Sequence, residues 1–157
     1  MCVLVFRFLK SAFIDCRQLH LYNCLMKVIV DSSALLAVVL MEPEREGLIR
    51  MTTGTEVTAP EILPYEIGNA LSAMIKRDRL SLEQALAAHE AFLRISVRLV
   101  ECDIRSALKL SKRLGIYAYE AYFLVSAQRL DCPLITLDRR MRQVAQELGI
   151  ALLESEQ

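Results

Sequence analysis

Two aspartates follow short β-branched and aliphatic runs of the sequence. Asp31 comes directly after residues 28–30, and Asp138 comes shortly after residues 134–136. If both runs are strands of one parallel sheet, both carboxylates lie at its carboxyl edge, where open α/β sheets bind ligands. Either aspartate could instead cap the helix that follows it, a role that contributes about 1 kcal/mol. Two aspartates at equivalent positions favour a shared site.

Two glutamates lie in apolar helical segments, where a carboxylate needs a partner or water. Glu66 borders an apolar stripe, and Asn69, three residues later, falls on the same side and could orient it. A boundary glutamate whose carboxylate reaches water fits the Glu66 pattern equally well. Glu120 is the only formal charge between Arg113 and Arg129, so it faces either solvent or a polar cleft. We favour the cleft.

Convergence of these four carboxylates would require a neutralising partner. Two like charges about 4 Å apart cost about 4 kcal/mol at an effective dielectric constant near 20. Protons or a divalent cation must therefore neutralise the cluster. Hard oxygen ligands with no nearby His or Cys select Mg²⁺ or Mn²⁺ over zinc. Such a cation can activate water and stabilise an in-line phosphoryl displacement, alone or as one of a pair of metal ions.

The composition restricts the class of protein. The chain has 157 residues, the size of one domain, and 54% of them are apolar against 24% charged. This balance excludes a disordered chain. Nineteen basic and 19 acidic residues give a formal charge of zero, which excludes binding of nucleic acid by bulk charge. Any polyanion must be held locally, by a site or a cation.

Cysteine usage and apolar runs point to a cytoplasmic protein without a membrane partner. Five cysteines are an odd number with no C-x-x-C pair, which fits neither a disulfide scaffold nor a zinc ribbon. We therefore expect a reducing cytoplasm. The longest uncharged apolar run, residues 34–41, is far shorter than the roughly 20 residues that cross a bilayer.

The first 25 residues differ from the rest in cysteine content and in hydrophobic periodicity. They hold three of the five cysteines and show no sustained helical or strand period. We interpret residues 1–25 as an N-terminal extension upstream of a true start at Met26, and residues 26–154 as the domain. A short helix packed on the domain is the alternative for 1–25. Three basic residues against one acidic give the extension +2, so the remaining 16 basic and 18 acidic residues give −2.

Strand-like and helical segments alternate along residues 26–154. Ser81 and Gln84 have the spacing of a capping box, and Asp103 and Gly115 are expected to begin and end a helix. The predicted strands are 28–31, 56–59, 97–101, 133–136 and 150–153, and the predicted helices are 34–41, 44–51, 60–79, 81–95, 104–114, 119–130 and 139–148. Segment 119–130 is apolar nearly all round and should be central. This order predicts a mostly parallel sheet with helices on both faces.

Four segments, in this order, resemble the PIN domain of the VapC toxin type: Val28-Ile29-Val30-Asp31-Ser32-Ser33-Ala34-Leu35, Glu66-Ile67-Gly68-Asn69-Ala70-Leu71, Tyr119-Glu120-Ala121-Tyr122-Phe123-Leu124-Val125-Ser126-Ala127 and Thr136-Leu137-Asp138-Arg139-Arg140. The resemblance covers about residues 26–153. It implies a three-layer α/β/α sandwich and a metal-dependent endoribonuclease that hydrolyses RNA. It also implies the toxin of a type II toxin–antitoxin pair, with frequent homodimers and a cognate antitoxin that blocks the cleft.

The resemblance also assigns roles to single residues. Asp31, Glu66, Glu120 and Asp138 match the metal-binding, catalytic acids, and Thr136 and Ser33 match supporting positions. The family usually has aspartate where Glu120 stands, and the extra methylene moves the carboxylate outward.

Two other functions fit parts of the pattern. The Glu120 departure fits a catalytically weak or inactive PIN-like domain that acts as a protein-binding module. A phosphotransfer enzyme could use Asp31 as nucleophile, but haloacid-dehalogenase-like enzymes need a second aspartate two residues on, where Ser33 stands. Tyr119 and Tyr122 could stack on bases, although we expect core packing for both.

Overall fold

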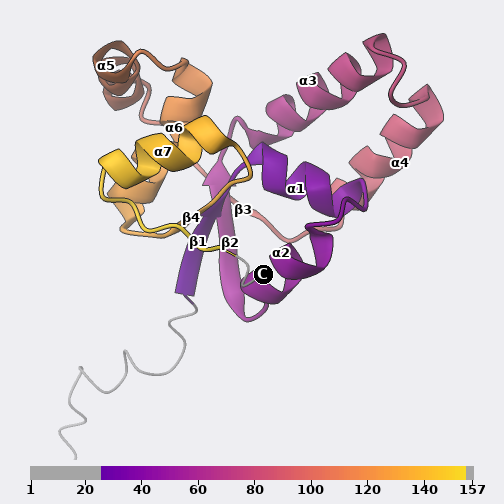
Figure 1. Ribbon diagram of the computed structural model, residues 1–157, viewed down its shortest axis with the longest axis horizontal. Coiled ribbons are helices and arrows are strands. Elements are labelled where there is room, and N and C mark those ends of the chain that lie inside the picture. The colour runs from indigo at the N-terminus through magenta and orange to yellow at the C-terminus, as the bar shows by residue number, and fades with distance from the viewer. Residues whose placement is uncertain (1–25, 155–157) are drawn as a thin grey trace, which may run out of the picture.

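The computed structural model describes residues 26–154, so the predicted extension 1–25 lies outside the described residues. A parallel sheet crosses the domain, with strands in the order β3-β2-β1-β4 (Figure 1). Its strands are β1 (Met26–Val30), β2 (Thr55–Pro60), β3 (Arg98–Val100) and β4 (Leu134–Ile135). The predicted strand at 150–153 is wrong as a strand, since only an isolated parallel bridge joins Leu152 to Leu134.

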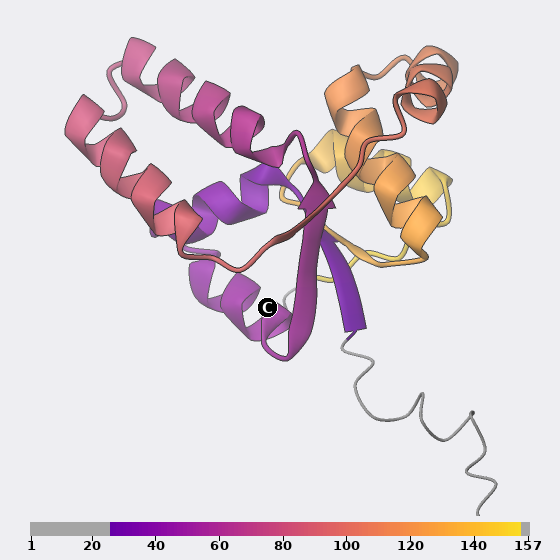
Figure 2. The ribbon, with the colours of Figure 1, turned by 180° about the vertical axis from the view of Figure 1, so that it is seen from behind.

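Helices cover both faces of this sheet. They are α1 (Ser32–Val39), α2 (Arg45–Thr52), α3 (Leu63–Lys76), α4 (Leu82–Leu93), α5 (Ile104–Leu114), α6 (Ala118–Leu130) and α7 (Arg139–Glu147). Helices α1 to α4 gather on one side and α5 to α7 on the other, and the α3–α4 pair projects away from the sheet (Figures 1 and 2). The predicted α/β/α architecture is confirmed. No helix within residues 26–154 is long and apolar enough to cross a membrane.

The centre of the sheet is apolar on both faces, as a parallel sheet between two helical layers requires. Val28, Ile29 and Val30 of β1 are buried, which confirms the strand predicted there. Helix α6 packs against β1 and β2, and its Phe123 and Leu124 are fully buried. The prediction of a central helix is therefore confirmed.

Helix ends follow local chemistry. Ser81 and Gln84 form the predicted capping box of α4, and the Asp103 side chain accepts a hydrogen bond from the Ser106 N–H at the start of α5. Gly115 ends α5 in the left-handed conformation, with φ of 63°. The prediction of a helix from Pro60 is wrong, because Pro60 is the last residue of β2. Pro64 instead occupies the first turn of α3, where its missing N–H costs no helical bond.

Candidate active site

The two strand-end aspartates lie at the same edge of the sheet. Asp31 follows β1 and Asp138 follows β4, and these strands pair in parallel. Each aspartate also caps a helix: Asp31 Oδ1 accepts from the Ala34 N–H at 3.1 Å, and Asp138 Oδ1 accepts from the Met141 N–H at 2.7 Å. The capping role and a role in a shared site are thus compatible, since a carboxylate has further lone pairs to offer.

Asp31 is the buried centre of the site, with 3% of its surface exposed. Its Oδ1 accepts from the Ser33 hydroxyl at 2.7 Å, and its Oδ2 accepts from the Thr136 hydroxyl at 2.6 Å. Thr136 Oγ1 in turn accepts from the Asp138 N–H at 3.0 Å, and Ser33 Oγ accepts from the Leu137 N–H at 3.0 Å. Ser33 and Thr136 therefore orient the carboxylate and tie the ends of β1 and β4 together.

The surroundings of Asp31 disfavour an unpartnered negative charge. Burial raises the pKa of its carboxyl group, hydrogen bonds from Thr136, Ser33 and Ala34 oppose that shift, and the charge of Asp138 adds to it. The net direction is upward. A buried carboxylate with a raised pKa gains stability from a proton or a cation.

The two glutamates lie in one cavity beside this edge. The cavity has a volume of about 420 Å³, and it is lined by Ser32, Glu66, Asn69, Tyr117, Tyr119 and Glu120. Glu120 therefore lies in a cleft, as we favoured from the sequence. Its Oε2 also accepts a hydrogen bond from the Tyr117 N–H at 2.8 Å, which caps the first turn of α6. Glutamate is a preferred residue at this third helical position, because its side chain reaches back to the cap.

Glu66 is coupled to the other acids. Burial raises the pKa of its carboxyl group to about 7, a hydrogen bond from the Ser32 side chain opposes this, and the charges of Asp31 and Glu120 reinforce it. Asn69 lines the same cavity, but in residues 26–154 it forms no hydrogen bond with Glu66. Electrostatic repulsion thus links Glu66 to acids on both sides of the cleft.

The four acids form a chain of interacting pairs and not a closed cage. Charge interactions connect Asp138 with Asp31, Asp31 with Glu66, and Glu66 with Glu120. Within the part of the chain that the structure describes, no three His, Cys, Asp or Glu side chains are grouped closely enough to hold a metal ion. The donor atoms are nevertheless all carboxylate oxygens, the ligand type that Mg²⁺ and Mn²⁺ prefer. Side-chain rotation would have to bring them together around an ion.

Two tyrosines and a serine also belong to the cleft. Tyr119 is 50% exposed and lines the cavity, so our expectation that it packs in the core is wrong. Tyr117 is 80% exposed, and Tyr122, which is partly buried, holds its ring edge-on to Tyr119 with centroids 6.2 Å apart. The position of Tyr117 and Tyr119 beside Glu120 in the sequence could have indicated that both lie in the cleft. Ser32 was missed, although it follows Asp31 directly.

Comparisons with known proteins show a family match. The family model described as the PIN domain matches residues 28–147. VapC ribonuclease Mb0985 of Mycobacterium bovis is 27% identical over 119 residues, which cover 76% of this chain and 91% of the relative. Ribonuclease VapC3 of Pyrobaculum aerophilum is 26% identical over 123 residues, which cover 75% of this chain and 94% of the relative.

Solved structures share the fold. PAE2754 from Pyrobaculum aerophilum superposes with a TM-score of 0.60 at 23% identity, over 75% of this chain and 85% of that one. VapBC2 from Rickettsia felis, solved with a DNA fragment from its promoter, gives a TM-score of 0.59 at 11% identity, over 83% of this chain and all of that one (100%). The family match spans both strand-end aspartates and both cleft glutamates, and the chain belongs to the PIN-domain family.

Proposed function

We propose that this protein is a metal-dependent endoribonuclease, the toxin of a type II toxin–antitoxin pair, that hydrolyses phosphodiester bonds in RNA. The observation that carries this proposal is the buried Asp31 carboxylate, held by Ser33 and Thr136 beside three further acids. The chain's membership of the PIN-domain family and the VapC ribonucleases among its relatives support the same activity. A site with this many carboxylates needs a cation before it can accept a phosphate.

The residues that would hold Mg²⁺ or Mn²⁺ are Asp31, Glu66, Glu120 and Asp138. A bound divalent cation would supply charge neutralisation for the phosphate and for the displacement at phosphorus. The chain's own contribution is orientation: the Thr136 and Ser33 hydroxyls fix both oxygens of Asp31, and burial keeps competing water away from them.

The substrate class follows from the aromatic side chains at the cleft. Tyr117 and Tyr119 expose their rings in the cavity that contains Glu66 and Glu120. Exposed aromatic faces stack on unpaired bases with little preference for sequence. A duplex keeps its bases stacked inside the helix, so we assign single-stranded segments of RNA as the substrate.

The test is cleavage of single-stranded RNA by the purified full chain with Mg²⁺ or Mn²⁺. We expect cleavage that EDTA abolishes and that Asp31→Asn reduces to background. Glu83→Gln removes an exposed acid from the first turn of α4 and serves as the control, with wild-type cleavage expected. Cleavage that persists in EDTA or in Asp31→Asn would refute the mechanism.

The proposed partner is a cognate antitoxin that blocks the cleft, and the proposed assembly is a homodimer in the cytoplasm. The fold shared with VapBC2 from Rickettsia felis supports the antitoxin. Co-purification of the product of an adjacent small gene, together with loss of RNA cleavage in the complex, would test the partner. Light scattering on the purified toxin would test the dimer, and a monomer at micromolar concentration would contradict it.

A further inference from the structure

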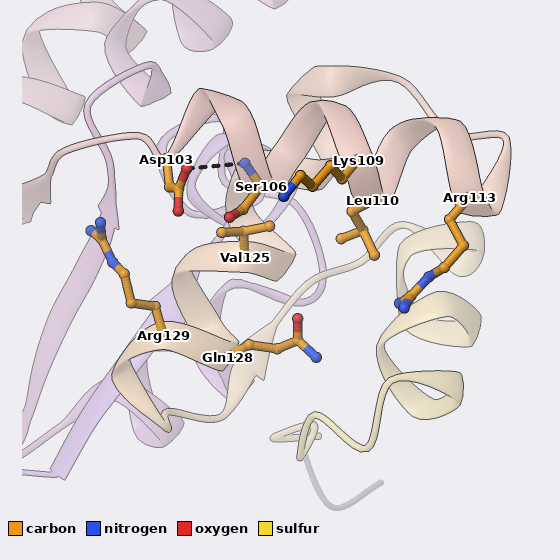
Figure 3. A pocket seen from close by; sticks show the side chains of 8 residues that line it. All are labelled: Asp103, Ser106, Lys109, Leu110, Arg113, Val125, Gln128 and Arg129. Carbon is orange, nitrogen blue, oxygen red and sulfur yellow. Dashed lines mark hydrogen bonds between the residues drawn. The ribbon is translucent and has the colours of Figure 1, made fainter.

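A second cavity, of about 470 Å³, lies between α5 and α6. Leu110 and Val125 give it an apolar floor (Figure 3). Around them Figure 3 shows polar and charged side chains from both helices: Asp103, Ser106, Lys109, Arg113, Gln128 and Arg129. A cavity of this size can take a group as large as a nucleotide.

The rim of this cavity is a local concentration of positive charge. It carries three cations and one anion, and the anion, Asp103, already accepts the Ser106 N–H at 3.0 Å as the cap of α5. Within residues 26–154, neither Lys109 nor Arg113 forms an ion pair. In a chain with a formal charge of zero, these cations are available to a ligand.

One residue that lines the cavity, Arg129, reaches the same edge of the sheet as the acidic cleft. Arg129 Nη2 donates to the carbonyl of Glu101 at 2.8 Å, and Glu101 directly follows β3. All strands of a parallel sheet end at one edge, and β3 lies two places from β1, which ends before Asp31. At about 4.8 Å per strand, the ends of β3 and β1 are about 10 Å apart across the sheet, and the Arg129 guanidinium lies at the end of β3. A segment of a few nucleotides of one RNA strand can span that distance.

We propose that the α5–α6 cavity binds the sugar–phosphate backbone of the RNA beside the cleavage site, through Lys109, Arg113 and Arg129. This inference rests on the proposed function and extends it. Lys, Arg and Gln are among the side chains that contact phosphate in nucleic-acid complexes, and such contacts position the strand without reading its sequence. The cavity therefore gives affinity that the acidic cleft, which repels phosphate, does not.

The experiment measures RNA affinity in the full chain carrying Asp31→Asn, so that RNA is bound and not cut. Lys109→Glu/Arg113→Glu reverses two cations of the cavity. Arg105→Glu/Lys112→Glu is the matched control, because it reverses two exposed cations of the same helix that do not line the cavity. For a single strand of about 16 nucleotides, we expect the cavity variant to bind at least about tenfold more weakly than the control. The slope of log affinity against log salt concentration should be smaller in magnitude for the cavity variant than for the control by about 1.4, because two phosphate contacts are lost.

Equal affinity and equal salt slope in the two variants, with unchanged thermal melting, would overturn the proposal. A polyglutamate peptide that binds the wild-type cavity more tightly than RNA does would also overturn it, since the cavity would then suit an acidic protein segment. With Asp31 restored, the cavity variant should cut both RNA of about four nucleotides and longer RNA more slowly than the Arg105→Glu/Lys112→Glu variant does. Failure of the wild type to cut either RNA would refute the proposed function, and the affinity comparison would still decide about the cavity.

Discussion

Thr136→Val removes the hydroxyl that connects the two strand-end aspartates. That hydroxyl donates to Asp31 Oδ2 at 2.6 Å and accepts from the Asp138 N–H at 3.0 Å, and the residue is only 6% exposed. A hydrogen bond to a charged group contributes about 1.5–3 kcal/mol. Replacement of the hydroxyl by a methyl group of similar size leaves a buried carboxylate without that donor. We expect a loss of about 2 kcal/mol relative to Thr136→Ser, which keeps the hydroxyl.

The loss should depend on pH in a definite direction. Burial already raises the pKa of Asp31, and Thr136 supplies the largest of the hydrogen bonds that lower it, so Thr136→Val raises the pKa further. An acid whose folded pKa exceeds its unfolded value stabilises the fold at low pH and loses that stabilisation as pH rises. The difference between Thr136→Val and Thr136→Ser should therefore grow as the pH rises above the ordinary pKa of an aspartate.

Urea denaturation in EDTA at several pH values measures this difference directly. The change in midpoint multiplied by the m-value gives the free-energy difference between the two variants. A difference below about 0.5 kcal/mol at every pH would refute the argument that Thr136 stabilises a buried charge, because changes of that size are typical of uninvolved positions. A difference that shrinks as pH rises would contradict the raised pKa of Asp31.

Three further predictions concern the cleft. Glu66 has a pKa of about 7 where the ordinary value is 4.5, so its ionisation destabilises the metal-free fold as pH rises through 7. Glu66→Gln should remove this pH dependence and add about 1 kcal/mol at about pH 8 after allowance for solvent screening, as urea denaturation in EDTA would show; an unchanged pH profile would refute it. Glu120→Asp should lose the bond to the Tyr117 N–H and cost about 0.5–1 kcal/mol in the same assay, and equal stability would contradict the capping role. If Glu120→Asp cuts RNA and the wild type does not, the chain is a binding module and not an active toxin. Tyr117→Ala should raise KM about tenfold with little change in kcat, Tyr117→Phe should retain the wild-type KM, and an equal KM in all three proteins would exclude base stacking.

Much of the candidate site was predictable from the sequence, because the pattern of apolar residues indicates where strands and helices lie along the chain. A β-branched run followed by Asp31 identifies a buried strand and its carboxyl end, and Asp138 follows the same rule. The placement of Glu120 in a cleft followed from the cost of burying an isolated charge in an apolar helix. These inferences need only local residues and the geometry of a parallel sheet.

Other features depend on tertiary contacts that no local pattern specifies. Tyr119 looks like a core residue in its segment, and its exposure follows from the position of α6 against the cleft. Thr136 and Asp31 are 105 residues apart in the sequence, so residue spacing cannot predict the hydrogen bond between them. Pro60 reads as a helix start, but its pairing in register with Val100 makes it the end of β2.

We propose that Asp31 and its neighbouring acids form a site for a divalent cation. Calorimetric titration of Mn²⁺ into the metal-free full chain, and into the same chain carrying Asp31→Asn, measures whether this site binds an ion. We expect saturable Mn²⁺ binding to the wild type and its loss in Asp31→Asn, with the folded structure retained. Equal Mn²⁺ binding by the two proteins, or none by the wild type, would contradict it.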